Sequence, residues 1–173
     1  MNIHTQLIQV LILVAGMIII LTSARLISGK SGRDWIFKLT RNLMFIIFTG
    51  ALIYLTFIYG GRGNHGNVEL TFRLSFWRAI KNSYYGALVH ASLMNLLLFV
   101  PLGYLLPQFK EIRFTRELRW WQNLIIAFAV SLAIETLQLV LHRGTFQLDD
   151  LIRNTEGGVI GFALARLTGC RRG

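Results

Sequence analysis

Long apolar runs recur along the whole chain and leave little choice of fold. Residues 7–24 read LIQVLILVAGMIIILTSA, and comparable runs occupy residues 35–59, 86–106 and 124–141. A helix needs about 20 such residues to cross the roughly 30 Å hydrocarbon core of a bilayer. With 54% hydrophobic residues in a chain of 173, too little polar surface remains to cover a soluble core of this composition. We therefore predict an all-α, integral membrane helical bundle.

The predicted bundle is a single membrane domain, residues 1–173, with about five transmembrane helices. Between the second and third helices, residues 60–85 form the longest polar connection. Its second half places apolar residues at helical spacing, which fits an amphipathic segment at the membrane interface. A solvent loop explains this segment nearly as well. The last helix, residues 155–168, is short for a membrane span.

The charge of the chain lies in the connections between these runs. The net charge is +10, and the Lys and Arg residues form clusters rather than a basic helix face. This pattern favours contact with membrane lipids and predicts no nucleic-acid partner. Twelve of the 18 Lys and Arg residues fall on one side of a five-helix topology and six on the other. The positive-inside rule therefore predicts a cell-membrane protein with an outer amino terminus and a cytoplasmic carboxyl terminus.

Polar side chains form a stripe on the fourth apolar run. Ser131, Glu135, Gln138 and His142 are spaced so that one helix face carries all four. A carboxylate on a membrane-crossing helix is unfavourable, so an ionisable residue there marks a functional site by default. Glu135 is therefore the first candidate residue. A neutral, hydrogen-bonded acid that only stabilises packing is the alternative explanation.

The third apolar run carries a second stripe of polar and small residues. Ser92, Asn95, Phe99 and Gly103 share one helix face, which we expect to point into the bundle. Pro101 removes a helical hydrogen bond, so it is predicted to kink or interrupt the helix. Asn95 either contacts a ligand or makes an interhelical hydrogen bond that only stabilises packing.

A compact charged segment, HRGTFQLDDLIRN, follows the fourth run at residues 142–154. Four of the eight Asp and Glu residues of the chain lie between residues 135 and 156. Arg143 could clamp a phosphate or carboxylate, and Asp149 and Asp150 could accept hydrogen bonds from a ligand. Opposite charges this close together equally suit a static network. Two adjacent carboxylates are too few ligands to predict a metal site, and no cofactor is predicted.

The last predicted helix carries small residues at a spacing that favours close packing. Asn154 is expected to be its N-cap, with Glu156 in its first turn. Gly157 and Gly161 lie four residues apart, and Gly158 widens this small face, so that another helix can approach closely. The approaching helix belongs either to the same chain or to a second copy in a homo-oligomer.

Two segments carry most of these features: NLLLFVPLGYLLP at residues 95–107 and ETLQLVLHRGTFQLDDLIRNTEGGVIG at residues 135–161. Together they resemble the VanZ-like family of bacterial membrane proteins, named for a protein associated with low-level resistance to the glycopeptide teicoplanin. The resemblance covers about residues 88–167, and its specificity comes from the combination of short motifs. The matching positions are Asn95, Phe99, Pro101, Gly103, Glu135, Gln138, Arg143, Asp149, Asp150, Asn154, Gly157, Gly158 and Gly161.

The resemblance implies a small membrane protein connected with the cell envelope and antibiotic resistance, and it supplies no reaction. Our leading hypothesis is a protein that binds or shields a polar envelope component, such as a lipid-linked cell-wall precursor or the glycopeptide. The expected ligand-binding residues are Asn95, Glu135, Gln138, Arg143, Asp149, Asp150 and Asn154. The expected helix-packing residues are Pro101, Gly103, Gly157, Gly158 and Gly161.

The alternative hypothesis is a membrane enzyme that modifies a lipid-linked envelope substrate. Glu135 or Asp149 would act as general acid or base, and Arg143 would stabilise an anion. No nucleophile motif is visible in the sequence, which favours the binding protein. A proton-coupled carrier that uses Glu135 is a third and weaker hypothesis.

Overall fold

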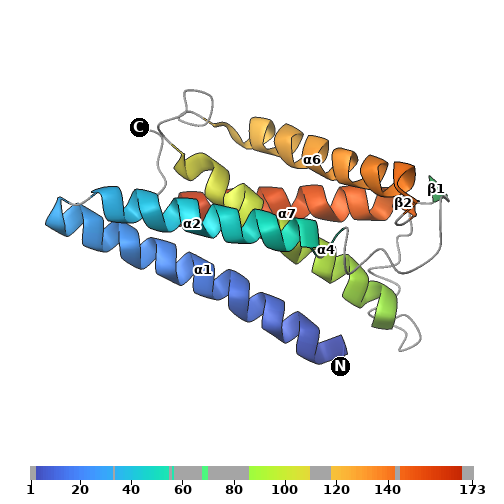
Figure 1. The fold of residues 1–173 in the computed structure, drawn as a ribbon, viewed down its shortest axis with the longest axis horizontal. Coiled ribbons are helices and arrows are strands. Elements are labelled where there is room, and N and C mark those ends of the chain that lie inside the picture. Colours follow the sequence, from blue (N-terminus) through green and yellow to red (C-terminus); the bar gives the residue numbers. More distant parts are fainter. Residues whose placement is uncertain are drawn as a thin grey trace.

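In the part of the chain that the computed structural model describes, five long α-helices run back and forth along one axis (Figure 1). The structure describes residues 3–32, 34–54, 56, 68–69, 86–109, 118–142 and 145–168. The helices are α1 (Ile3–Ser31), α2 (Asp34–Ile53), α4 (Gly86–Leu105), α6 (Trp120–Val140) and α7 (Leu148–Leu167). A 3-10 turn, η4 (Leu106–Gln108), continues α4, and a short parallel pairing joins β1 (Val68–Glu69) to β2 (Phe146–Gln147). The predicted all-α bundle is confirmed.

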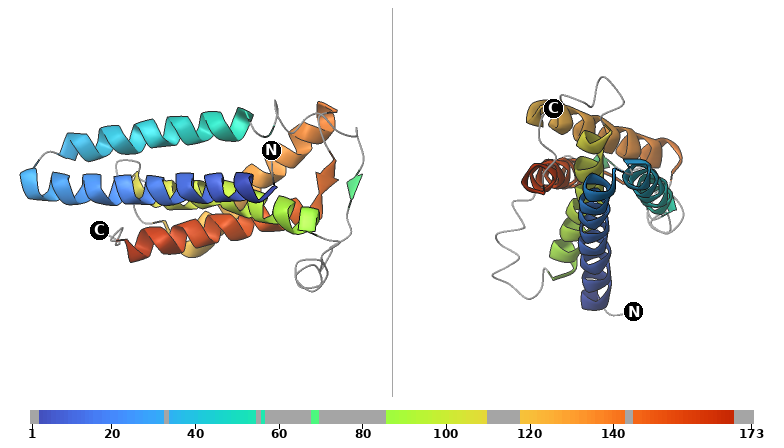
Figure 2. Two further views of the ribbon diagram at one scale, coloured as in Figure 1. Left: turned by 90° about the horizontal axis from the view of Figure 1, so that it is seen from below. Right: turned by 90° about the vertical axis from the view of Figure 1, so that its left-hand side faces the viewer.

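The helix α4 lies at the centre of the bundle. It packs against every other α-helix of the described chain, most extensively against α7, while α1 also packs on α2 and α6 on α7 (Figure 2). Within residues 92–105, where the side chains of α4 are described, every residue is buried or half-buried. In contrast, α1, α2 and α6 expose large apolar side chains, among them Leu13, Ile46 and Val140. The outer helices therefore provide the surface that suits lipid.

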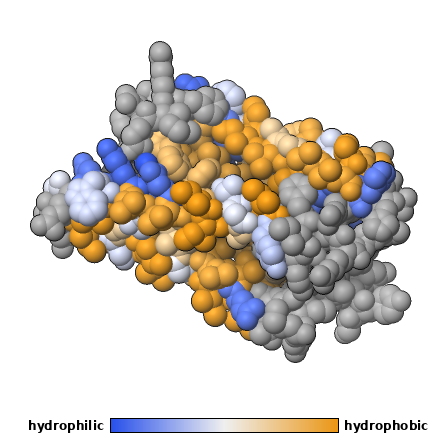
Figure 3. All heavy atoms as spheres, in the orientation of Figure 1, coloured by the Kyte–Doolittle hydropathy of each residue, from blue (hydrophilic) through white to orange (hydrophobic). Residues whose placement is uncertain are grey.

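This arrangement explains why the helices differ in apolar character. Three of them, over Leu7–Gly29, Asp34–Ile53 and Trp120–Val140, are long and apolar enough to cross a membrane, and α4 contains a shorter apolar stretch, Ser92–Gln108. Apolar side chains make up most of the coloured part of the face shown in Figure 3. A helix that faces lipid must be apolar toward it, whereas a helix covered by protein can carry small and polar residues. The chain is accordingly a helical membrane protein.

The start of α7 differs from the prediction. The helix begins at Leu148 and has 20 residues, so the expected short helix starting at residue 155 is wrong. Asp149 and Asp150 occupy its first turn, where the positive end of the helix dipole favours carboxylates. Asn154 is consequently buried within the helix, and the N-cap is Gln147. The expected N-cap role of Asn154 and first-turn position of Glu156 are corrected accordingly.

Glycines bring the backbones of α4 and α7 into direct contact. A Cβ atom on Gly103 would overlap the carbonyl oxygen of Gly158, and one on Gly161 would overlap the carbonyl oxygen of Val100. Gly157 meets the backbone of α4 in the same way. The small face of α7 is therefore buried against a helix of the same chain, and it does not form a free surface for the second copy that the sequence left open.

The proline of α4 does not interrupt the helix. Pro101 is buried, and α4 continues through it to Leu105. The largest fully buried side chains beside it are Phe99 and Tyr104, which pack into separate apolar clusters on α4. The central helix thus packs on both sides of the proline. The predicted amphipathic segment in the second half of residues 60–85 lies, apart from β1, outside the described residues.

Candidate functional site

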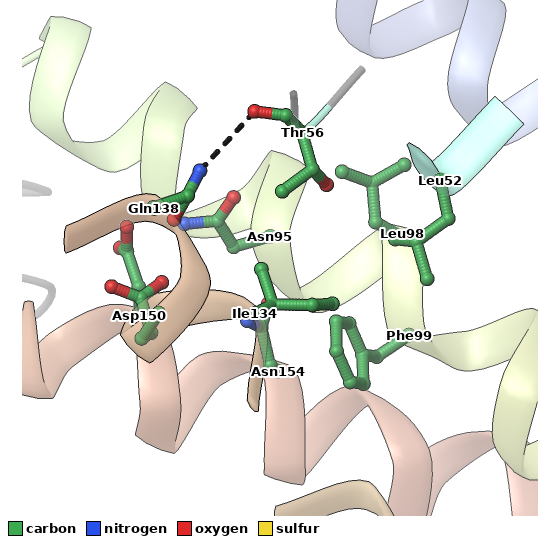
Figure 4. A pocket seen from close by; sticks show the side chains of 10 residues that line it. Leu52, Thr56, Asn95, Leu98, Phe99, Ile134, Gln138, Asp150 and Asn154 are labelled. Atoms are coloured by element: carbon green, nitrogen blue, oxygen red, sulfur yellow. Dashed lines mark hydrogen bonds between the residues drawn. The ribbon is translucent and has the colours of Figure 1, made fainter. Parts of the chain in front are cut away.

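A cavity of about 150 Å³ lies at the end of the bundle where α2 and α6 finish and α7 begins (Figure 4). We call it the pocket. Four helical segments line it, and its walls combine apolar side chains with carboxylates and amides. The lining residues are Leu52, Thr56, Asn95, Leu98, Phe99, Ile134, Glu135, Gln138, Asp150 and Asn154. Five of the seven expected ligand-binding residues therefore meet at one cavity.

Glu135 is the most deeply buried charged residue of the pocket. Its side chain is 3% exposed, and its Oε2 accepts a hydrogen bond of 3.0 Å from the backbone N–H of Gln147. Gln147 is the N-cap of α7, so this bond joins the last turns of α6 to the start of α7. Within the described chain, Oε1 of Glu135 accepts no hydrogen bond. One oxygen of the carboxylate is thus available in the pocket.

Three amides surround this carboxylate and are used differently. Gln138 donates from Nε2 to the carbonyl oxygen of Thr56 at 3.3 Å, and Asn154 donates from Nδ2 to Oγ of Ser131 at 2.9 Å. These bonds connect α6 to the chain beyond α2 and to α7. The side-chain amide of Asn95 makes no hydrogen bond to any described residue, although it is half-buried beside Gln138 (Figure 4). Its NH₂ group and its oxygen line the pocket without a partner in the described part of the chain.

The two adjacent aspartates take different positions at the start of α7. Asp150 lines the pocket, whereas Asp149 does not. Oδ1 of Asp149 is buried without a hydrogen-bond partner among the described residues. A buried, unsatisfied oxygen of this kind costs about 1–3 kcal/mol. Both carboxylates gain from the positive end of the α7 dipole, which is the local reason that α7 can begin with them.

Other charged residues of the predicted cluster lie apart from the pocket lining. Arg153 forms an ion pair of 2.7 Å with Glu156 on the more exposed side of α7. His142 follows α6 in a left-handed conformation with φ of 53°, and its side chain is exposed. Of the polar stripe on α6, only Glu135 and Gln138 therefore line the pocket. Ser131 does not line it and instead accepts a hydrogen bond from Asn154. Arg143 and Gly144 lie outside the described residues.

A family model described as VanZ/LLP1 matches residues 8–169, nearly the whole chain. The protein belongs to the VanZ/LLP1 family. The resemblance found in residues 88–167 is thereby confirmed, and family membership extends over α1 and α2. Comparisons with curated proteins and with solved structures find no match.

In this VanZ/LLP1 protein, α2 and the chain directly after it contribute pocket residues that the sequence did not indicate. Leu52 lines the pocket with an apolar side chain, and Thr56 binds Gln138 through its backbone carbonyl. Neither feature leaves a signal in the sequence, because one is an ordinary apolar residue and the other a backbone atom. Leu98 and Ile134 directly precede Phe99 and Glu135, but adjacent residues of a helix point in different directions, so the spacing gave no signal for them either.

The chemistry available in the pocket is that of hydrogen bonding and charge. Among the described residues, no group of three or more His, Cys, Asp or Glu side chains is placed to hold a metal ion. The pocket offers carboxylate and amide oxygens beside the ring of Phe99. This combination suits recognition of a small polar group whose neighbouring part is apolar.

Proposed function

We propose that this VanZ/LLP1 protein binds the polar group of a cell-envelope component in the pocket, and that it contributes to glycopeptide resistance by binding or shielding that component. The observation that carries the proposal is the meeting of Asn95, Glu135, Gln138, Asp150 and Asn154 at one cavity. Buried polar groups are normally paired. Here the amide of Asn95 and one oxygen of Glu135 line the cavity without a hydrogen-bond partner among the described residues.

We infer further that the pocket opens toward the outer side of the membrane. The ends of α2 and α6 and the start of α7 lie at the same end of the bundle as the amino terminus of α1 (Figure 1). The excess of Lys and Arg belongs to the opposite end, which the positive-inside rule assigns to the cytoplasm. On this topology we expect Arg143 and the long connection of residues 60–85 to belong to the outer face, as the pocket does, so that Arg143 is available to clamp a phosphate or carboxylate of the ligand.

The test is bacterial survival on teicoplanin in a susceptible host that produces the wild type or one variant. Glu135→Gln and Asn95→Leu alter the pocket, while Glu156→Gln makes the same chemical change as the first outside it. The amount of each protein in the membrane is measured in the same cells. We expect the wild type and Glu156→Gln to protect, and the two pocket variants to lose protection at unchanged abundance. Equal protection by all four proteins would overturn the proposal.

A further inference from the structure

We propose that the pocket selects a primary ammonium group. This inference rests on the proposed function, because it takes the pocket as the binding site and names the chemical class of the group that enters it. Three properties of the pocket lead to it: the direction of the hydrogen bonds around it, the sign of its charge, and its size.

The hydrogen bonds around the pocket leave mainly acceptors to face its interior. Gln138 directs its NH₂ group to the carbonyl oxygen of Thr56, an atom that can only accept, so the orientation of this amide is fixed. Asn154 directs its Nδ2 to Ser131. The amide oxygens of these two residues therefore remain, together with Oε1 of Glu135, and Asn95 adds one amide oxygen and one NH₂ group. A ligand that fits such a lining must donate hydrogen bonds.

The charge of the lining selects among possible donors. Of the ten lining residues that the structure describes, two are carboxylates and none is Lys, Arg or His. The argument depends mainly on Glu135, which is 3% exposed: burial disfavours its charged form unless a cation lies beside it. A primary ammonium group has one positive charge, three donors and no acceptor. A neutral hydroxyl group satisfies fewer acceptors and leaves the carboxylate without a counter-charge.

The wall opposite the polar groups also suits a cation. Phe99 lines the pocket and is 2% exposed, so its ring is held in place by packing. An ammonium group close to an aromatic ring is attracted electrostatically by the negative face of the ring. Leu98 and Ile134 complete the apolar side of the pocket. The methylene groups beside an ammonium can pack against them.

The volume limits how much of a molecule can enter. A cavity of about 150 Å³ holds a group of roughly benzene size. An aminoethyl group fits, whereas a complete sugar chain or lipid does not. The remainder of the ligand therefore lies outside the pocket. The source of the ammonium group is either the headgroup of a membrane lipid or a water-soluble amine, and the experiment distinguishes the two.

The first arm of the experiment compares two soluble probes of similar size and shape. Ethanolamine and ethylene glycol, which carry an ammonium and a hydroxyl group at the same position, are titrated by calorimetry into the purified full-length protein in detergent. We expect ethanolamine to bind at least about tenfold more tightly than ethylene glycol, because hydrogen bonds to a charged group are stronger than those between neutral groups. Glu135→Gln should lose this preference and Glu156→Gln should keep it. Glu135→Asp, which retains the charge, should restore part of it.

The second arm assigns the source. The protein is placed in nanodiscs that contain phosphatidylethanolamine or phosphatidylcholine, whose nitrogen has no N–H donor, and retained lipid is counted by native mass spectrometry. Selective retention of phosphatidylethanolamine, lost in Glu135→Gln, supports an ammonium site filled by a lipid headgroup. Equal retention, combined with ethanolamine binding in the first arm, supports an ammonium site filled by a soluble amine.

Two results would overturn the inference: equal affinity for ethanolamine and ethylene glycol, or unchanged ethanolamine binding by Glu135→Gln. Neither result contradicts the proposed function if cells that produce the pocket variants still lose their protection against teicoplanin. Conversely, ammonium selectivity combined with full protection by the pocket variants would retain this inference and remove the proposed envelope role. The unfolding temperature of each variant is measured beforehand, so that a failure to fold is not counted as a failure to bind.

Discussion

The two ends of the bundle use buried polar residues in opposite ways. At the end away from the pocket, Arg41 is 4% exposed and donates to the carbonyl oxygen of Gln108 at 2.9 Å. Arg25 donates to the carbonyl oxygen of Thr168 at 3.1 Å and to Oε1 of Gln108 at 3.1 Å. We call these four residues the arginine end. Its side chains connect α1 and α2 to η4 and to the end of α7.

The difference between the two ends lies in where the hydrogen bonds go. At the arginine end, the arginines donate hydrogen bonds to carbonyl oxygens in the last turns of η4 and α7 that have no partner within their own helix. The guanidinium of Arg41 also lies over the ring of Phe109, 4.2 Å from its centre. At the pocket, Asn95 and one oxygen of Glu135 make no such bonds within the described chain. The hydrogen bonds of the arginine end therefore stabilise the fold. The pocket keeps polar groups available for a ligand, and this lowers the stability of the fold.

The largest effect is expected at the arginine end. Arg41→Met removes the donor to Gln108 and the contact with Phe109, and we expect the free energy of unfolding to fall by about 2–3 kcal/mol. The control is Arg153→Met, which removes an arginine whose ion-pair partner Glu156 is exposed and should cost about 0–1 kcal/mol. Denaturation of both variants in detergent measures the difference. Equal losses would remove the contrast between the two ends.

At the pocket, the comparison predicts a gain in stability. Asn95→Leu replaces a half-buried amide without a hydrogen-bond partner among the described residues by an apolar side chain of similar size. We expect the unfolding free energy to rise by about 1 kcal/mol, and ethanolamine binding to weaken in the same protein. Thermal unfolding with and without ethanolamine checks both parts. Destabilisation by Asn95→Leu would show that Asn95 has a structural role.

A smaller effect is expected for the carboxylate itself. In Glu135→Gln the amide oxygen can still accept from the backbone N–H of Gln147, while the buried charge disappears. The free energy of unfolding should therefore stay equal or rise by up to about 1 kcal/mol. Chemical unfolding in the same detergent measures this, with Glu156→Gln as the matched surface variant. A clear loss of stability in Glu135→Gln alone would favour a purely structural acid.

The smallest effect is expected at the edge of the pocket. Gln138→Leu removes the single bond of 3.3 Å to the carbonyl oxygen of Thr56. This bond is long, and the group that it satisfies is only half-buried, so the unfolding free energy should change by less than about 1 kcal/mol. Hydrogen exchange at the end of α2 gives the more sensitive measurement. Unchanged exchange in the variant would show that this bond does not hold α2 against α6.

The sequence predicted the helices better than their boundaries. The apolar runs identified α1, α2 and α6 because helices that face lipid must be apolar over most of their surface. The start of α7 was missed because Asp149 and Asp150 suggested a polar loop, whereas at a helix amino terminus the same carboxylates are stabilising. Spacing alone could not show that Asn154 binds Ser131.

The pocket could be predicted only in part. Helical spacing correctly placed Glu135 and Gln138 on one face of α6, because that face is fixed by the geometry of a single helix. The contribution of Leu52 and Thr56 depends on how α2 lies against α4 and α6, which no local pattern encodes. The position of Arg143 relative to the pocket stays a prediction.

The close packing of α4 and α7 has a consequence for how the protein enters the membrane. A segment passes from the translocon into lipid according to its apolar character. The charged first turns of α7 keep it below that requirement, and α7 is not among the helices that meet it. The glycine contacts with α4, which is synthesised earlier, supply the missing attraction. The pocket therefore forms late in biogenesis, when α7 docks against α4. This docking, rather than the transfer of α7 into lipid by itself, determines when the pocket is complete.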